Sequence, residues 1–232
     1  MMKRLFIWLS LSLVLFLLLA GCSSIPWGIS NIDWVDFIKL SDITYLRAYQ
    51  VGSINESDLS PYDKISYKVA DNVRNPAYKI KNGDAAYLEA GTPVYSLNGY
   101  APSFRLVARS NQEFLIYEAD SNPKAKKGSD LLDIGGKVES ISINSKIDGK
   151  TELATIKEQT QVNELEGMIL EAPVDQDSSK TGSEHYFLEF HLNDGTTTKR
   201  SYWLDTELLS RGIQLPEEFG IAIQSALNEQ RK

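Results

Sequence analysis

The chain has 232 residues, of which 24 are Lys or Arg and 31 are Asp or Glu, giving a net charge of −7. An acidic surface argues against nucleic acid as a partner and against electrostatic docking on anionic lipid. The single cysteine, Cys22, leaves no pair for an internal disulfide.

The first part of the chain is typical of a secretory signal. Lys3 and Arg4 form a basic head, and residues 5–20 are apolar apart from Ser10 and Ser12. This run is shorter than the roughly 20 residues that cross a bilayer as a helix, so a membrane span is the weaker interpretation. A buried helix is weaker still, because the run has no polar face.

The run ends in Leu19-Ala20-Gly21-Cys22, which resembles the lipobox of bacterial lipoproteins. The resemblance implies cleavage between Gly21 and Cys22 and attachment of diacylglycerol to the Cys22 thiol. We therefore predict a signal peptide over residues 1–21. The lipid anchor would hold the mature protein to the extracytoplasmic face of the cell membrane. The alternative is an ordinary signal with a chance cysteine.

Cleavage would leave 211 residues with a net charge of −9 and no free thiol, enough chain for one large or two small domains. The missing thiol excludes disulfides, thiolate metal sites and cysteine nucleophiles. Residues 22–32 hold Ser, Pro, Gly and Asn and are expected to form a tether. Trp27 is expected either at the lipid interface or packed into the following domain.

Residues 33–135 are predicted to form a β-rich domain of antiparallel hairpins. Runs rich in Val, Ile, Tyr and Phe at alternating positions are typical of half-buried strands. Turn dipeptides that favour positive φ lie between such runs at Asn82-Gly83, Asn98-Gly99, Asp148-Gly149 and Asp194-Gly195. The strands expected in this part are DWVDFIKL, KISYKVA, AAYLEA, TPVYSL, SFRLVA and EFLIYEA.

The remaining chain is predicted to combine a sheet with two helices. The first helix is expected within TQVNELEGMILEAP, with Thr160 as its N-cap and Pro173 barring its continuation. The second helix is expected to begin with Pro216 as its first helical residue. Gly220 should weaken this helix by about 1 kcal/mol relative to alanine. The strands expected around them are KVESISIN, ELATIK, HYFLEFHL and TKRSYWL.

A domain boundary is expected near residue 135. The polar run at residues 120–130 has no periodicity, and Gly135-Gly136 follows it closely. We predict a β-rich α+β protein with antiparallel hairpins in the first domain and an α+β domain over residues 136–232. One fused core is the main rival to two domains.

The strand HYFLEFHL is the best candidate for a metal site. His185, Glu189 and His191 are expected on one face of it, and imidazole and carboxylate are plausible zinc ligands. The two histidines would lie about 20 Å apart along a strand, too far to share one ion. Glu189 with His191 supplies only two ligands, so we predict polar residues on a solvated sheet face and no metal.

Carboxylate pairs offer the other chemistry. Glu118 with Asp120, and Asp130 with Asp133, could serve glycoside hydrolysis if a cleft held two acids about 5 to 10 Å apart. Chance pairing in an acidic chain is the favoured interpretation. The sequence lacks a G-x-S-x-G elbow, a G-x-G-x-x-G motif and a Walker loop, so neither a serine triad nor nucleotide binding is supported.

Tyrosines are abundant in the predicted first domain, and aromatic surfaces bind sugars and proteins well. We expect most of these rings to pack in the core instead, because tyrosine is a good strand former. They include Tyr62, Tyr67, Tyr78, Tyr87, Tyr95, Tyr100 and Tyr117.

Several stretches together resemble a family of functionally uncharacterised lipoproteins of Gram-positive, spore-forming bacteria. They include DWVDFIKLSDITYL, GDAAYLEAGTPVYSLNGYAPSFRLVA, IYEADSNPKAKKGSDLLDIGGKVESISINS and SYWLDTELLSRGIQLPEEF. The resemblance covers nearly the whole mature chain. It implies a location on the outer face of the cytoplasmic membrane, and it carries over no catalytic residue to this chain.

The sequence thus predicts a lipid-anchored extracytoplasmic module that binds a ligand, a cell-wall component or a protein, without a cofactor and without enzymatic activity. A hydrolase acting on wall polymer through a carboxylate pair is the first alternative. The substrate-binding lipoprotein of a transporter is the second, although the alternating strand–helix pattern of such proteins is missing.

Overall fold

The computed structural model describes residues 32–49, 54–175 and 181–230. The predicted signal peptide, Gly21, Cys22 and nearly all of the tether lie outside these residues. None of the helices within the described ranges is long and apolar enough to cross a membrane.

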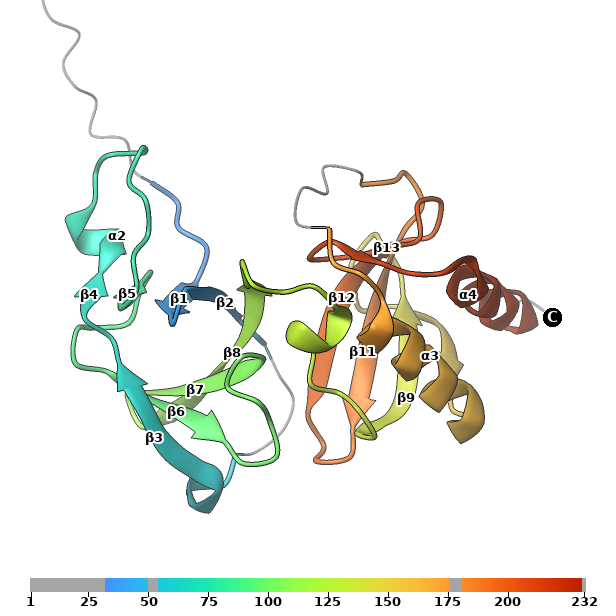
Figure 1. Cartoon of the computed structure of the whole chain (residues 1–232), viewed down its shortest axis with the longest axis horizontal. Helices are drawn as coiled ribbons and strands as arrows, with labels where there is room; N and C mark the ends of the chain where they lie inside the picture. The colour runs from blue at the N-terminus through green and yellow to red at the C-terminus, as the bar shows by residue number, and fades with distance from the viewer. Residues whose placement is uncertain (1–31, 50–53, 176–180, 231–232) are drawn as a thin grey trace, which may run out of the picture. The chain divides into compact units, whose positions relative to one another are not determined.

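The first half of the chain forms an eight-stranded sheet in the order β3-β6-β7-β8-β2-β1-β5-β4 (Figure 1). All its pairings are antiparallel except β4 with β5. Two short helical segments, η1 (Glu56–Asp58) and α2 (Val69–Asn72), lie between its strands. The strands are β1 (Phe37–Leu40), β2 (Ile43–Arg47), β3 (Leu59–Lys64), β4 (Tyr67–Lys68), β5 (Asp84–Ala85), β6 (Pro93–Leu97), β7 (Arg105–Ser110) and β8 (Glu113–Ser121).

Two predictions about single strands in this half are wrong. KISYKVA supplies only Lys64 at the end of β3 and the two residues of β4 before the chain turns into α2 at Val69. AAYLEA contributes only Ala85 to a strand. The glycines of the four predicted turns, Gly83, Gly99, Gly149 and Gly195, do have positive φ. Two tight hairpins of this half form around residues with positive φ that are not glycine. These are Ser41 and Asp42 between β1 and β2, and Asn111 and Gln112 between β7 and β8.

The second half forms a six-stranded sheet in the order β10-β9-β11-β12-β13-β14. A 3-10 turn, η2 (Gly128–Asp130), precedes it, and α3 (Gln159–Glu171) and α4 (Glu217–Glu229) pack on it (Figure 1). The β-rich α+β prediction is confirmed. The strands are β9 (Val138–Asn144), β10 (Glu152–Ile156), β11 (His185–Leu192), β12 (Thr197–Trp203), β13 (Leu208–Leu209) and β14 (Ile213–Gln214).

The core of the second sheet follows from alternation along its strands. Leu188 and Phe190 of β11 are fully buried on one face, and they pack in one cluster with apolar residues of both helices, such as Leu165 and Phe219. Burying a side chain of this size stabilises the fold by about 1.5–3 kcal/mol. Phe104, which precedes β7, belongs to the same cluster.

The helix termini differ in detail from the predicted caps. Glu158, not Thr160, caps α3: its carboxylate accepts hydrogen bonds from the backbone N–H of Thr160 and of Gln161. Pro216 is the N-cap of α4 and not its first helical residue. A Cβ atom at Gly220 would lie 2.1 Å from Glu207 Oε1, so the end of that side chain would have to shift to admit a larger residue.

The predicted division at residue 135 falls between the two sheets, since β8 ends at Ser121 and β9 begins at Val138. By internal contacts, however, residues 34–73 and 78–232 form one compact unit, and Arg74–Ala77 group outside it. Two separately folding domains therefore remain a prediction.

A glycine in η2 gives a sharp test of this packing. A Cβ atom at Gly128 would lie 1.9 Å from the backbone oxygen of Ile169 in α3. We expect Gly128→Ala to lower the free energy of unfolding by about 1–3 kcal/mol, the usual effect of overpacking, in urea denaturation of the full chain. Gly167→Ala is the control, because that exposed position of α3 has nothing within 4 Å and should gain up to about 1 kcal/mol. Equal stability of the two variants would contradict the close packing of η2 on α3.

Candidate functional site: a basic pocket beside a buried ion network

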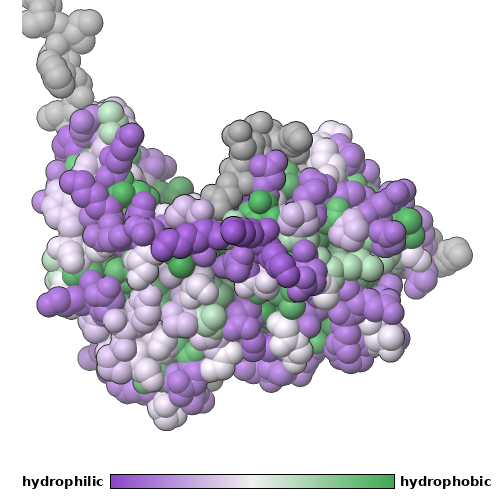
Figure 2. Space-filling view, viewed as in Figure 1, coloured by the Kyte–Doolittle hydropathy of each residue, from purple (hydrophilic) through white to green (hydrophobic). Residues whose placement is uncertain are grey.

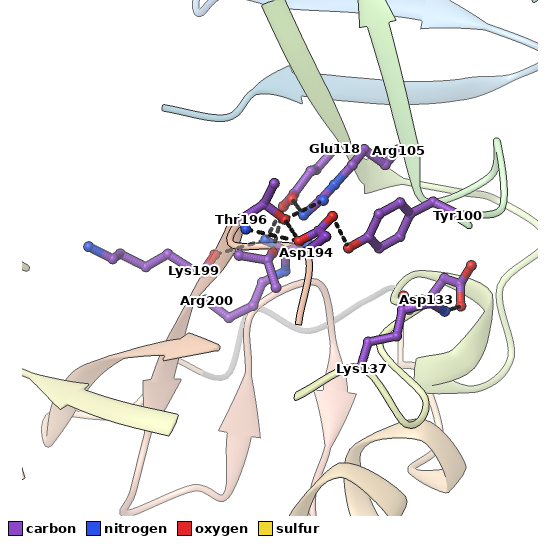
Figure 3. Close-up of polar contacts among 10 residues, drawn as sticks. Tyr100, Arg105, Glu118, Asp133, Lys137, Asp194, Thr196, Lys199 and Arg200 are labelled. Carbon is purple, nitrogen blue, oxygen red and sulfur yellow. Dashed lines mark hydrogen bonds and ion pairs between the residues drawn. The ribbon is translucent and has the colours of Figure 1, made fainter. Parts of the chain in front are cut away.

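A buried carboxylate on β8 joins the two sheets through charged hydrogen bonds. Glu118 faces Arg105 across the β7–β8 pairing, and Arg105 Nη2 donates to its Oε1 at 2.7 Å. From β12, Arg200 Nη1 donates to Glu118 Oε2 at 2.9 Å and Thr198 Oγ1 donates to the same oxygen at 2.6 Å. Figure 3 shows Arg105 and Arg200 converging on Glu118 from different strands. The side chains of all three ion-paired residues are at most 4% exposed.

Burial and charge act in opposite directions on Glu118. Desolvation favours the neutral acid, but the charges of Arg200 and Arg105, with the hydrogen bonds from Thr198 and Arg105, hold the pKa of Glu118 below its ordinary value. The carboxylate is therefore ionised in the folded protein at neutral pH, and the network contains two cations around one anion.

The network extends to the turn between β11 and β12. Arg105 Nη1 donates to Thr196 Oγ1 at 2.9 Å, and Thr196 Oγ1 donates to Asp194 at 2.7 Å. Tyr100 donates its hydroxyl to the other oxygen of Asp194 at 2.7 Å, and its ring lies 4.4 Å from the Arg105 guanidinium carbon. Burial, together with the hydrogen bond to Asp194, raises the pKa of Tyr100 to about 12. The Asp194-Gly195 turn is thus fixed to the first sheet.

Next to this network lies a cavity of about 300 Å³. Its charged lining residues are Arg47, Lys199, Arg200 and Arg211 against Glu118 and Glu189. Backbone and small or apolar side chains from the end of β2 and from β12 complete the wall. They are Leu46, Ala48, Tyr49, Thr197 and Thr198.

Several charged donors at the pocket have no hydrogen-bond partner within the described ranges. They are Nε of Arg47 and both Nε and Nη2 of Arg200, all of them buried. An unmade hydrogen bond of a buried charged group costs more than the 1–3 kcal/mol of a neutral one, so such atoms are uncommon in a folded protein. They identify the pocket as the strongest candidate for a ligand site.

Arg211 adds a further cation to the same wall. Its Nη1 lies 2.7 Å from Asp120 Oδ1 and its Nε donates to the backbone oxygen of Ala119 at 2.9 Å. Burial and the nearby charge of Arg200 lower the pKa of Arg211 to about 10. Arg211 therefore remains a cation at neutral pH, in a field that disfavours further positive charge.

The structure places the predicted metal candidates in different surroundings on the predicted face of β11. His185 stacks on Trp203 with ring centroids 5.0 Å apart, and His191 Nε2 lies 2.9 Å from Ser142 Oγ. Glu189 pairs with Lys199 at 2.9 Å, which brings it to the pocket. No group of three or more metal-ligating side chains occurs in the part of the chain that the structure describes.

Each carboxylate of the two candidate catalytic pairs, Glu118 with Asp120 and Asp130 with Asp133, forms hydrogen bonds or ion pairs with other groups. Glu118 belongs to the ion network and Asp120 to the pair with Arg211. Asp130 accepts the backbone N–H groups of Lys126 and Lys127, which hold its pKa below the ordinary value. Asp133 pairs with Lys137 and accepts the backbone N–H of Ala101.

The expectation that the tyrosines of the first half pack in the core is wrong for most of them. Of the seven, Tyr117 alone is fully buried, and Tyr62, Tyr67 and Tyr87 are 37–46% exposed. Two of these hydroxyls bind neighbouring loops: Tyr87 donates to the backbone oxygen of Trp34, and the Tyr62 hydroxyl lies 3.2 Å from Ser41 Oγ.

On the face shown in Figure 2, hydrophilic side chains predominate and hydrophobic ones are scattered.

Sequence reasoning missed the pocket. Arg47, Arg200 and Arg211 are far apart in the chain and belong to no motif, and only the pairing of distant strands brings them together. The one available signal was the position of Arg200 in β12. It lies on the same strand face as Thr198 and Tyr202, and all three side chains are buried.

No protein-family model, curated protein or solved structure matches this chain. The resemblance to lipoproteins of spore-forming bacteria therefore stays a prediction.

The ion network predicts a specific acid sensitivity. Because the folded state lowers the pKa of Glu118, its carboxylate stabilises the fold above the ordinary pKa of 4.5, and this contribution is lost as the pH falls below it. Glu118→Gln leaves two buried guanidinium groups without their anion, so we expect a loss of about 3–5 kcal/mol at pH 7.

Urea denaturation at pH 7 and at pH 4 measures both effects. The variant should lose less stability than the unsubstituted chain on acidification, since it has no carboxylate left to protonate. Glu113→Gln, an exposed position at the start of the same strand, is the control and should change stability by under about 0.5 kcal/mol. Similar losses in both variants would show that the network is not stabilising.

Proposed function

We propose that this protein is a membrane-anchored extracytoplasmic lipoprotein that acts as a binding module and takes its ligand into the basic pocket. The proposal depends above all on one observation: the buried Arg200 carries two charged donors without partners at the wall of a cavity. A ligand with acceptor oxygens would offer partners to donors that have none among the described residues.

The size and shape of the site suit a small molecule. A cavity of about 300 Å³ lies at the lower end of the range for ligand pockets. Its arginines are fixed before binding: Arg200 by Glu118, and Arg211 by Asp120 and Ala119. Prepositioned groups lose little conformational entropy when a ligand binds, which favours affinity.

The anchor forms the second part of the proposal. Cys22 follows small residues at the end of an apolar run. Lipid attached to Cys22 would hold the chain to the membrane, although its negative charge gives no electrostatic attraction to anionic lipid. Two or more acyl chains give stable attachment, whereas one is marginal.

A ligand screen tests the binding function. We expect a thermal-shift panel of anions, sugars, amino acids and divalent metals, run on the full chain in non-ionic detergent, to raise the melting temperature with anions. Saturation at a hundred times the dissociation constant adds about 2.7 kcal/mol, which is a shift of roughly 5–10 °C for a chain of this size. Silence across the whole panel would remove the support for a small-molecule module.

Fractionation of cells tests the anchor. Cys22→Ser removes the only thiol, so we expect the variant to leave the membrane fraction or to remain unprocessed, as seen by gel mobility and immunoblotting. Ser23→Ala is the matched control and should remain in the membrane fraction. Membrane attachment of Cys22→Ser equal to that of the control would overturn the lipoprotein assignment.

A further inference from the structure

The charges that line the pocket do not cancel. Lys199 pairs with Glu189 at 2.9 Å and also donates to the backbone oxygen of Gly149, so these two lining charges neutralise each other. In Figure 3 the Lys199 side chain points away from the ion network. The remaining lining charges are three guanidinium groups, on Arg47, Arg200 and Arg211, and one carboxylate, Glu118. Beyond the lining, Arg105 pairs with Glu118 and Asp120 pairs with Arg211, so four guanidinium groups face two carboxylates and the excess is two positive charges.

The single anion in the wall is already shared. Glu118 accepts hydrogen bonds from Arg105, Arg200 and Thr198, and Arg105 does not line the pocket. Arg47 and Arg200 together retain three unmet donors. The excess of positive charge matches one compact dianion.

We propose that the pocket binds a terminal phosphate group, carried by a small organic molecule or by a lipid headgroup; the inference rests on the binding function proposed above. A phosphate monoester presents three free oxygens and about −1.5 to −2 charge at neutral pH, and arginine forks match its geometry. A carboxylate brings one charge and two oxygens. A phosphodiester likewise has one charge and two free oxygens.

The rest of the molecule disfavours a long polyanion. The predicted mature chain has a net charge of −9, so phosphates that extend beyond the pocket would face an acidic protein. A ligand whose charge is concentrated at one end avoids this repulsion. Leu46, Ala48 and the ring of Tyr49, whose centroid lies 5.9 Å from the Arg47 guanidinium carbon, provide contacts for an uncharged part of the ligand.

Titration calorimetry on the full chain in non-ionic detergent tests the inference. The probes are inorganic phosphate, glycerol 3-phosphate, acetate and mixed micelles that carry phosphatidic acid. We expect a phosphate probe to bind and acetate to bind at least tenfold more weakly. Binding of glycerol 3-phosphate identifies a soluble ester as the source, and binding of phosphatidic acid alone identifies a lipid headgroup.

Two arginines provide a matched pair of variants. Arg47 on β2 and Arg109 on β7 each lie over an aromatic ring, at 5.9 Å from Tyr117 and 5.5 Å from Phe114 respectively, but only Arg47 lines the pocket. Arg47→Gln should weaken phosphate binding about tenfold or more, the effect of losing one charged hydrogen bond. Arg109→Gln should leave it unchanged. Arg47→Lys keeps the positive charge but loses the two parallel N–H donors of the guanidinium. We expect an intermediate affinity for phosphate. An unchanged melting temperature would show that binding, and not folding, is affected.

The pH dependence follows from the ligand. The second ionisation of a phosphate monoester lies near pH 6, so affinity should rise roughly tenfold between pH 5 and pH 7 as the dianion forms. The charged residues that line the pocket are Arg47, Lys199, Arg200, Arg211, Glu118 and Glu189. Glu118, whose pKa lies below its ordinary value, and Arg211, whose pKa is about 10, keep their charges across this range, so neither contributes to the change.

The outcomes separate the two proposals. Tight binding of acetate with none of a phosphate probe, an affinity that is flat or falls with pH, or equal losses in Arg47→Gln and Arg109→Gln would overturn the phosphate assignment. A carboxylate ligand lost in Arg47→Gln would leave the proposed binding function standing. No binding of any anion, together with silence of the thermal-shift panel, would overturn both.

Discussion

A buried, ionised carboxylate determines much of this structure. Glu118 lies on β8 of the first sheet, and its two oxygens are held by Arg105 from the neighbouring strand and by Arg200 from the second sheet. Removing an ion pair of this kind from water costs several kcal/mol per ion, which the attraction offsets only when geometry and hydrogen bonds are good. The register of β7 with β8 and the placement of β12 are therefore coupled through one side chain. The network adds specificity of arrangement to the stability that the apolar cores provide.

The cores themselves were largely predictable from the sequence. The alternation in HYFLEFHL places Leu188 and Phe190 inward as expected, and the helical spacing of Val162, Leu165 and Ile169 gives the buried face of α3. Four strands escaped prediction: β2, β3 and the two-residue strands β13 and β14. β2 and β3 are short runs that mix polar and apolar residues, and β3 has no buried residue, so no hydrophobic period marks it. The turn before β2 uses Ser41 and Asp42 at positive φ, where Gly or Asn is the usual signal.

The pocket could not be predicted for a related reason. In EFLIYEA, Glu118 shares a strand face with Phe114 and Ile116, and nothing local shows which distant strand covers its part of that face. Arg200 in TKRSYWL presents the same ambiguity. Local patterns report which residues share a face of a strand. They do not report which distant strand covers that face, and here that covering turns two ordinary surface-type residues into a buried ion pair.

The ion network and the pocket depend on each other physically. Arg200 uses Nη1 for Glu118 and for the backbone oxygen of Lys199, which fixes the plane of its guanidinium and leaves Nε and Nη2 without acceptors in the described chain. The group cannot turn toward water without breaking the charged bonds that hold it. The same contacts that stabilise the joint between the sheets thus keep two charged donors unsatisfied beside a cavity. The site is therefore preorganised for an anion. Its positive electrostatic field is maintained because the contacts of the fold hold the Arg200 guanidinium in place.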